Sequence, residues 1–280
     1  MDSSKSKGVA GKVAVVTGGG QGLGRAIAQA LADEGAKLVI CDINASTLDT
    51  ARQELEAGGT EVLALRCDVG DRAAVDAMFE QAGQRFGTVD ILVNNAGLVP
   101  STPAEEEGRK RHYAYRTSPM PRQSLGVTTS LSDNDWHKWW GVNVHGVFYC
   151  TRAALRFMEK QRAGRIVNIA SVAGLGAGSM HSPGYSATKA AVVSLTQTVA
   201  FDVAGANILV NAIACGGVNT PPMLAYLEGA TPEQRASLFQ LVPLGRFADA
   251  DQYARLAVYL AGEDHYFVGQ VLSPNGGYVI

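Results

Sequence analysis

The feature that most constrains the fold is a regular alternation of short apolar runs with longer amphipathic segments. The runs are continuous in Val, Ile and Leu, which is typical of parallel strands covered by helices on both faces. Seven candidate strands occupy residues 12–17, 37–42, 61–68, 89–95, 164–171, 207–214 and 269–273. Helical patterns occupy residues 22–35, 45–57, 71–86, 133–161, 183–204 and 249–262. This order predicts an α/β fold with one doubly wound parallel sheet of about seven strands.

A sheet of this size uses nearly all of the 280 residues. We therefore expect one domain over residues 11–280, preceded by a flexible tail at residues 1–10. Residues 98–131 are polar and too long for an ordinary strand-to-helix loop, and they are interpreted as an insertion. Residues 216–247 begin with Gly and Pro and then predict one or two short helices, as in a substrate lid.

Composition excludes several classes of protein. The chain has 24 Lys and Arg against 26 Asp and Glu, so no overall field favours nucleic acid or an anionic membrane. No apolar run approaches the roughly 20 residues of a membrane span, and the first residues lack the apolar core of a secretory signal. The four cysteines are widely spaced, as in reduced intracellular proteins, which predicts a cytoplasmic location. The five histidines are scattered without a ligand pattern, and no metal site is predicted.

The stretch "TGGGQGLG" follows the first candidate strand and opens the first helix. Gly18, Gly22 and Gly24 remove side chains where backbone would approach the diphosphate of a dinucleotide at a helix N-terminus. A tight strand-to-helix turn without a ligand is the alternative interpretation.

Asp42 ends the second candidate strand, about 20 residues after the glycines. A carboxylate there accepts hydrogen bonds from both adenosine ribose hydroxyls and repels a 2′-phosphate. Gln21 and Ile43, on either side of this position, supply no cation for such a phosphate. The cofactor is therefore predicted to be NAD rather than NADP, with a helix N-cap role for Asp42 as the alternative.

The ends of the third and fourth candidate strands, "RCDV" and "NNAG", carry further candidates. A carboxylate there can bond the adenine amino group, and a small backbone lets the dinucleotide lie close. An amide side chain can line the groove or instead tie neighbouring strands together. The candidates are Asp68, Val69, Asn95, Ala96 and Gly97.

Tyr185 and Lys189 stand four positions apart in the helical stretch "GYSATKAAVVSLTQ" and so share one helix face. A free phenol has a pKa near ~10, too high for an efficient base at neutral pH. A neighbouring ammonium and an oxidised nicotinamide both favour the phenolate. The pair is therefore predicted to be an acid/base catalyst.

Two further polar residues fall at chemically useful places. Ser171 ends the fifth candidate strand, where ligands of doubly wound sheets bind, and its hydroxyl can hold a substrate oxygen. It is preferred to Ser179 and Ser182 because it follows the strand directly. Asn143 lies inside a predicted helix, an unfavourable place unless its amide or the local backbone has a role, such as holding a water in a proton chain.

"TGGGQGLG", "NNAG", Asn143, Ser171 and "YSATK", in this order, resemble the short-chain dehydrogenase/reductase family of single-domain Rossmann-fold enzymes, across residues 11–280. The resemblance implies that Tyr185 is the acid/base, Lys189 lowers its pKa and binds the nicotinamide ribose, Ser171 polarises the substrate oxygen and Asn143 holds a relay water. It implies a homotetramer. The tryptophans Trp136, Trp139 and Trp140 are interpreted as packing between helices of adjacent subunits, with an aromatic shelf for the substrate as the alternative. The implied cofactor-binding set is Gly18, Gln21, Gly22, Leu23, Gly24, Asp42, Ile43, Asp68, Val69, Asn95, Ala96, Gly97, Tyr185, Lys189, Val218 and Thr220.

One departure concerns the loop after the sixth candidate strand, where Cys215 stands in place of the family's usual proline. We expect this change to loosen the loop that carries Val218 and Thr220.

The predicted function is transfer of a hydride between a secondary alcohol and NAD, giving a ketone, with Tyr185 as acid/base. The alternatives are a ketone reductase of the same family and a dinucleotide-binding protein without catalysis. The small-molecule substrate is hypothesised to carry an anionic group bound by insertion arginines such as Arg109, Arg111 and Arg116. A solvated flap, or an arm that contacts a neighbouring subunit, is the alternative for the insertion. His181, in the loop before Tyr185, is expected to be a surface histidine rather than a substrate contact.

Overall fold

The computed structural model describes residues 8–176, 179–263 and 265–279, and it confirms the predicted fold class. Seven parallel strands form one sheet in the order β3-β2-β1-β4-β5-β6-β9. The order reverses between β1 and β4, which is where doubly wound sheets bind ligands. The strands are β1 (Val13–Thr17), β2 (Lys37–Asp42), β3 (Val62–Arg66), β4 (Ile91–Asn94), β5 (Gly164–Ser171), β6 (Ile208–Cys215) and β9 (Val271–Leu272).

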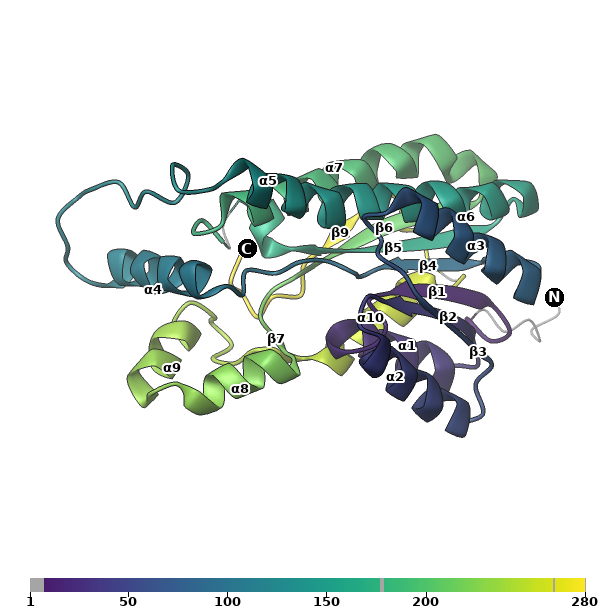
Figure 1. Ribbon diagram of the computed structural model, residues 1–280, viewed down its shortest axis with the longest axis horizontal. Coiled ribbons are helices and arrows are strands. Elements are labelled where there is room, and N and C mark those ends of the chain that lie inside the picture. Colours follow the sequence, from purple (N-terminus) through teal and green to yellow (C-terminus); the bar gives the residue numbers. More distant parts are fainter. Residues whose placement is uncertain (1–7, 177–178, 264, 280) are drawn as a thin grey trace.

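Helices cover both faces of the sheet (Figure 1). One layer holds α1 (Gly22–Asp33), α2 (Ala45–Ala57) and α10 (Ala250–Ala261). The opposite layer holds α3 (Arg72–Phe86), α6 (Val147–Gln161) and α7 (Pro183–Val203). Alternate side chains of a strand point to opposite faces of the sheet. In β1, Ala14 and Val16 therefore pack against the first layer, and Val13 and Val15 pack against the second.

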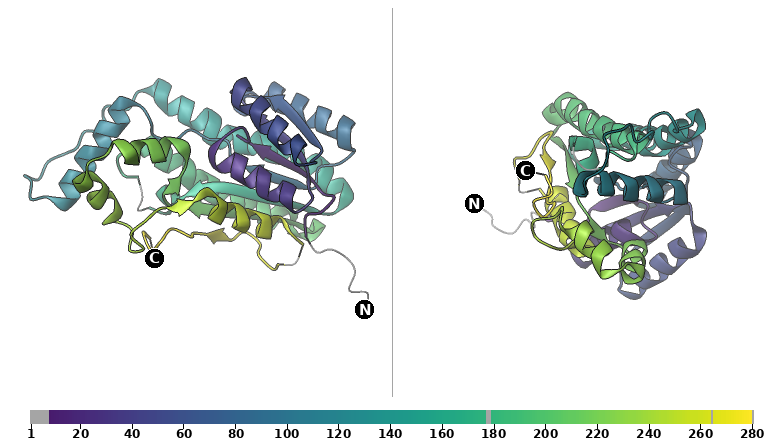
Figure 2. Two further views of the ribbon diagram at one scale, coloured as in Figure 1. Left: turned by 90° about the horizontal axis from the view of Figure 1, so that it is seen from below. Right: turned by 90° about the vertical axis from the view of Figure 1, so that its left-hand side faces the viewer.

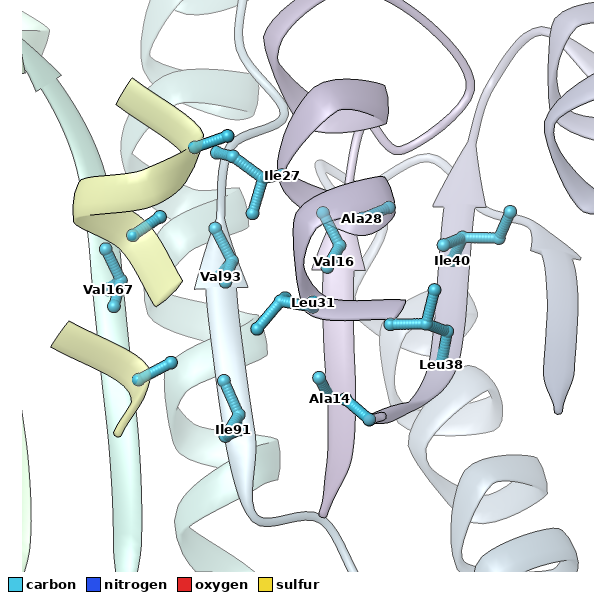
Figure 3. Packing of buried hydrophobic residues seen from close by; sticks show 14 of the residues in the cluster. Ala14, Val16, Ile27, Ala28, Leu31, Leu38, Ile40, Ile91, Val93 and Val167 are labelled. Carbon is cyan, nitrogen blue, oxygen red and sulfur yellow. The ribbon is translucent and has the colours of Figure 1, made fainter. Parts of the chain in front are cut away.

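The first layer forms a closely packed core. Figure 3 shows Ile27 and Leu31 of α1 lying over the sheet beside Val16 and Val93, and all four side chains are fully buried. Burying each of the larger aliphatic side chains contributes about 1.5–3 kcal/mol. This packing fixes the direction of α1, and hence the place where its N-terminus meets the end of β1.

The predicted helix over residues 133–161 consists of three successive segments. These are α5 (Asp133–Trp140), a π-helical turn (Gly141–Gly146) and α6. Asn143 lies in the π-helical turn, a departure from regular helix of the kind that often accompanies functional sites.

The insertion is not simply a polar loop, because it contains the helix α4 (Pro103–Thr117). Thr102 and Glu105 form a capping box, and Pro103 occupies the first helical turn. Figures 1 and 2 show α4 beside α8 and α9 at one end of the molecule, beyond the sheet. The insertion therefore extends the ligand-binding end of the fold.

The predicted lid contains α8 (Pro221–Gly229) and α9 (Pro232–Phe239). The expectation that Cys215 loosens the loop after β6 stays a prediction, but two contacts hold that loop in place. The short strand β7 (Val218–Asn219) pairs with β8 (Ala248–Asp249), and the Gly216 N–H donates to the Tyr253 hydroxyl over 3.0 Å. Single 3₁₀ turns at Val172–Leu175 and Ala204–Ala206 complete the secondary structure of the described residues.

Val9, which the sequence places in a flexible tail, lies in the core. Val9 is only 1% exposed and packs in the first core layer, so the expectation of a flexible tail is wrong for residues 8–10. The remainder of the predicted tail, residues 1–7, lies outside the described residues. Within the described ranges, none of the helices combines the length and apolarity needed to cross a bilayer.

Candidate active site

A cavity of about 850 Å³ lies at the carboxyl ends of the strands. Most of the residues predicted from the sequence line it, although their positions in the chain are far apart. Those lining residues are Gly18, Gln21, Leu23, Asp42, Ile43, Asp68, Val69, Asn95, Ala96, Gly97, Ser171, Tyr185, Lys189, Val218 and Thr220. Gly22, Gly24 and Asn143 are not among the lining residues, and they contribute through the backbone and the packing around it.

The glycine-rich turn has the shape of a diphosphate cradle. Gly18 and Gly22 have φ values of +64° and +56°, which favour glycine. A Cβ on Gly24 would lie 2.1 Å from the Gly18 carbonyl oxygen, so only glycine allows α1 to approach the turn so closely. α1 begins after Gln21 with no side-chain cap and no acidic residue in its first turn. Its first N–H groups therefore suit an anionic ligand.

Asp42 lines the cavity and is only 8% exposed. Its Oδ2 accepts the Gly20 N–H over 3.2 Å, and its Oδ1 accepts the Asn44 N–H over 3.0 Å. Asn44, not Asp42, caps α2 by accepting the N–H groups of its first turn. The N-cap interpretation of Asp42 is therefore wrong, and the carboxylate is held rigidly at the cavity wall.

Arg66 is a cation in this region that sequence reasoning missed. It is the residue paired with Asp42 across β2 and β3, and its Nε donates to the Ile43 carbonyl over 3.2 Å. Arg66 is exposed and is not among the residues that line the cavity. Strand register alone, with a strand end at Asp42, could have indicated this proximity.

The remaining dinucleotide candidates combine structural and lining roles. Asp68 Oδ1 accepts the Gly70 N–H over 2.9 Å, and Val69 packs closely against Gly146. Asn95 Nδ2 donates to the carbonyls of Thr17 and Gly18 over 3.0 and 3.2 Å. Asn95 therefore ties β4 to the glycine turn and also lines the cavity, so both sequence interpretations hold for it.

Tyr185, Ser171 and Lys189 converge on the same cavity from α7 and the end of β5. The ring of Tyr185 is buried edge-on against Trp139, with centroids 5.7 Å apart. Lys189 Nζ lies 5.9 Å from the centroid of the Tyr185 ring and donates to the Ile169 carbonyl over 2.8 Å. The two side chains therefore share one face of α7, as their spacing predicts.

Burial dominates the titration of this pair. It raises the pKa of Tyr185 to about 12, and hydrogen bonding with Ser171 opposes the increase. Burial also lowers the pKa of Lys189 to about 8. In the chain alone, the shift at Tyr185 is therefore opposite to the one predicted for a phenol beside an ammonium. Both shifts favour the neutral forms of the two groups.

Asn143 has three protein partners. Its Oδ1 accepts the Leu98 N–H over 2.7 Å, and its Nδ2 donates to the Leu98 carbonyl and the Thr188 hydroxyl, both over 3.2 Å. The side chain therefore joins the π-helical turn, the chain after β4, and α7. The role implied by the resemblance, holding a relay water, stays a prediction.

Several cavity-lining residues come from helices outside the predicted motifs, and nothing in the sequence indicated that they lie together. Arg109 and Tyr113 of α4, Lys138 of α5 and Tyr226 of α8 all line the cavity. His181 also lines it and is 7% exposed, so its expected surface position is wrong. Trp139 is 6% exposed and packs within its own chain against Gly184 and Tyr185, which corrects its expected packing between subunits.

Comparison with known proteins is consistent with this geometry. Residues 12–229 match the family model for short chain dehydrogenases. The chain belongs to the short-chain dehydrogenase family.

Its relatives include two dehydrogenases of similar length. One is the (2S)-[(R)-hydroxy(phenyl)methyl]succinyl-CoA dehydrogenase subunit of Thauera aromatica, 36% identical over 96% of this chain and 97% of the relative. The other is the 2-(R)-hydroxypropyl-CoM dehydrogenase of Xanthobacter autotrophicus, 36% identical over 95% of this chain and 98% of the relative. The crystal structure of levodione reductase superposes with a TM-score of 0.80 at 32% identity, covering 96% of this chain and 97% of that one. Members of this family are oxidoreductases that act on alcohols and ketones with nicotinamide dinucleotides.

Proposed function

We propose that this chain is an NAD-dependent dehydrogenase that oxidises a secondary alcohol to a ketone, reversibly, with Tyr185 as acid/base. The observation that carries the proposal is that one cavity is lined both by the glycine turn with Asp42 and by Ser171, Tyr185 and Lys189. A protein that only binds a dinucleotide has no need of the second group. The relatives' names, two dehydrogenases and a reductase, support the same reaction class.

Each residue of the catalytic group has its own role in the proposed reaction. The Ser171 hydroxyl would hold the substrate oxygen, and Tyr185 would take the alcohol proton; a bound nicotinamide would supply the hydride acceptor. Lys189 would bind the nicotinamide ribose, and Asn143 would hold the water through which the proton leaves. A phenol with a pKa raised by burial stays almost fully protonated at neutral pH, so the positive charge of an oxidised nicotinamide would be needed to favour the phenolate.

The preference for NAD rests on Asp42. Its carboxylate is fixed at the cavity wall by two backbone N–H groups, and it would repel a 2′-phosphate. Arg66 is a nearby cation that would favour a 2′-phosphate and hence NADP. Its Nε, however, already donates a hydrogen bond to the Ile43 carbonyl. The proposal extends to a cytoplasmic homotetramer, since the four cysteines are free and buried and the family resemblance implies that assembly.

The test follows the absorbance of reduced nicotinamide with a panel of secondary alcohols, using NAD and NADP separately, and then the reverse reaction with ketones. We expect kcat/KM to be at least about tenfold higher with NAD, a difference of about 1.4 kcal/mol. Asp42→Ala should reduce that ratio, while the matched variant Arg66→Ala should leave it unchanged. An equal or higher kcat/KM with NADP in the wild type would contradict the NAD assignment.

A further inference from the structure

The insertion brings a cation to the wall of the cavity. Of its basic side chains, Arg109 lines the cavity, whereas Lys110, Arg111, Arg116 and Arg122 are not among the lining residues. Arg109 is half-buried, and its guanidinium carbon lies 5.0 Å from the centroid of the Tyr226 ring of α8. Stacking on an aromatic face holds a guanidinium in place and leaves its N–H edges available for a planar anion.

Among the described residues that line the cavity, none at the insertion end is acidic. The acidic lining residues are Asp42 and Asp68, which follow β2 and β3, whereas Arg109 and Lys138 come from α4 and α5. Glu105 belongs to the same helix as Arg109, but its carboxylate caps α4 by accepting the Ser101 and Thr102 N–H groups. The side chains that line the insertion end therefore include the cations Arg109 and Lys138 and no carboxylate, while Glu105 acts on His181 from outside the lining.

His181 adds an unsatisfied polar group to the same wall. It is 7% exposed, lines the cavity, and its Nδ1 is buried without a hydrogen-bond partner in the described structure. The centroid of its ring lies 6.1 Å from that of His112 and 6.3 Å from that of Tyr113, both of α4. Helix α4 therefore packs against the loop that carries His181. A buried imidazole nitrogen without a partner is costly, and a ligand that bonds it recovers that cost.

Apolar side chains make up much of the surrounding wall. They are Leu98, Val99, Met223, Leu238, Val242 and Phe247. Such a wall suits a substrate with an apolar body and one localised charge.

We propose that Arg109, with His181 beside it, forms a carboxylate-binding subsite, so that the substrate is a secondary alcohol with an apolar body and a carboxylate group. This inference rests on the proposed function, because it assigns the substrate class of the same cavity. Arg109 is the specificity-determining residue of this subsite.

The test compares Arg109→Gln with Arg111→Gln, an exposed position on the same helix. Binding of cyclohexanecarboxylate and of neutral cyclohexanecarboxamide is measured calorimetrically on the full chain with NAD present. We expect Arg109→Gln to weaken carboxylate binding at least about tenfold and to leave amide binding unchanged, while Arg111→Gln changes neither. Equal carboxylate binding by wild type and Arg109→Gln, including no binding by either, would overturn the assignment, and so would equal weakening of both ligands.

Kinetics separate this inference from the proposed function. The kcat/KM ratio of 4-hydroxycyclohexanecarboxylate to its methyl ester should fall at least about tenfold in Arg109→Gln and stay constant in Arg111→Gln. Turnover of both substrates with the same ratio in all variants overturns the subsite and leaves the dehydrogenase proposal standing. Carboxylate binding that depends on Arg109, without turnover of any alcohol, supports the subsite and refutes the dehydrogenase proposal.

Discussion

Burial raises the pKa of Tyr185, whereas the proposed acid/base role needs a lower pKa. Its ring is enclosed by Trp139 and the end of β5, and burial raises its pKa to about 12. Lys189 is buried as well, with a pKa of about 8, so the ammonium is partly neutral at slightly alkaline pH. In the proposed reaction, the phenol would need a further positive charge beside it to become a phenolate, which would link proton transfer to occupation of the dinucleotide site.

His181 gives a pH prediction at the residue scale. Burial, and then the charges of Arg109 and His112, lower its pKa to about 4, while Glu105 opposes the shift. An unfolded chain protonates this imidazole near its ordinary pKa of about 6.5. The unfolded state therefore binds more protons between those values, and the free energy of unfolding falls as pH falls from about 6.5 to 4.

Urea denaturation at pH 7.5 and pH 5 measures this contribution. The wild type should lose roughly 1–2 kcal/mol more than His181→Gln over that interval. The difference between the two proteins cancels the contributions of other titrating groups. Identical losses would show that His181 titrates normally in the folded state.

At the scale of elements, Asn143 holds three segments together. Its amide joins the π-helical turn to the Leu98 backbone and to Thr188 of α7. Asn143→Leu keeps the branched shape and the number of heavy side-chain atoms but leaves the Leu98 N–H unpaired in a part-buried place, which should lower the free energy of unfolding by about 2–4 kcal/mol.

Denaturant unfolding of Asn143→Leu, with Asn134→Leu as control, tests this role. Asn134 is exposed on α5, so its replacement should change stability by less than about 0.5 kcal/mol. A similar small effect at Asn143 would show that its amide is not a structural joint.

A helix or strand can be predicted from the sequence when it packs in the main core, because its apolar periodicity then shows in the chain. The strands and sheet helices were found because their apolar periodicity reflects burial in one core. α4 was missed, although Thr102, Pro103 and Glu105 carry a helix-start signal. Its contact face, Gly108 and His112, is small and polar, so periodicity could not reveal it. The position of Arg109 against Tyr226 depends on the docking of α4 beside α8, which no local pattern contains.

At the scale of the whole molecule, parallel pairing explains why scattered motifs form one site. Every strand of the main sheet runs in the same direction, so the segments that follow β1, β2, β3, β4 and β5 meet at one edge. The motif residues could therefore be assigned to one cavity from the sequence. Tyr113 and Tyr226 of its far wall could not, because they come from the insertion and the lid, which pack on each other rather than on the sheet (Figure 2).

The central claim is that Tyr185 transfers the proton in a dinucleotide-dependent reaction, and Tyr185→Phe tests it most directly. The matched control is Tyr259→Phe on the exposed side of α10, 51% exposed and not among the cavity residues. We predict that Tyr185→Phe lowers kcat by about 10²- to 10⁴-fold while NAD binding, measured by calorimetry, stays within a factor of about three of wild type, and that Tyr259→Phe changes neither. Turnover by Tyr185→Phe within about tenfold of wild type would contradict the account.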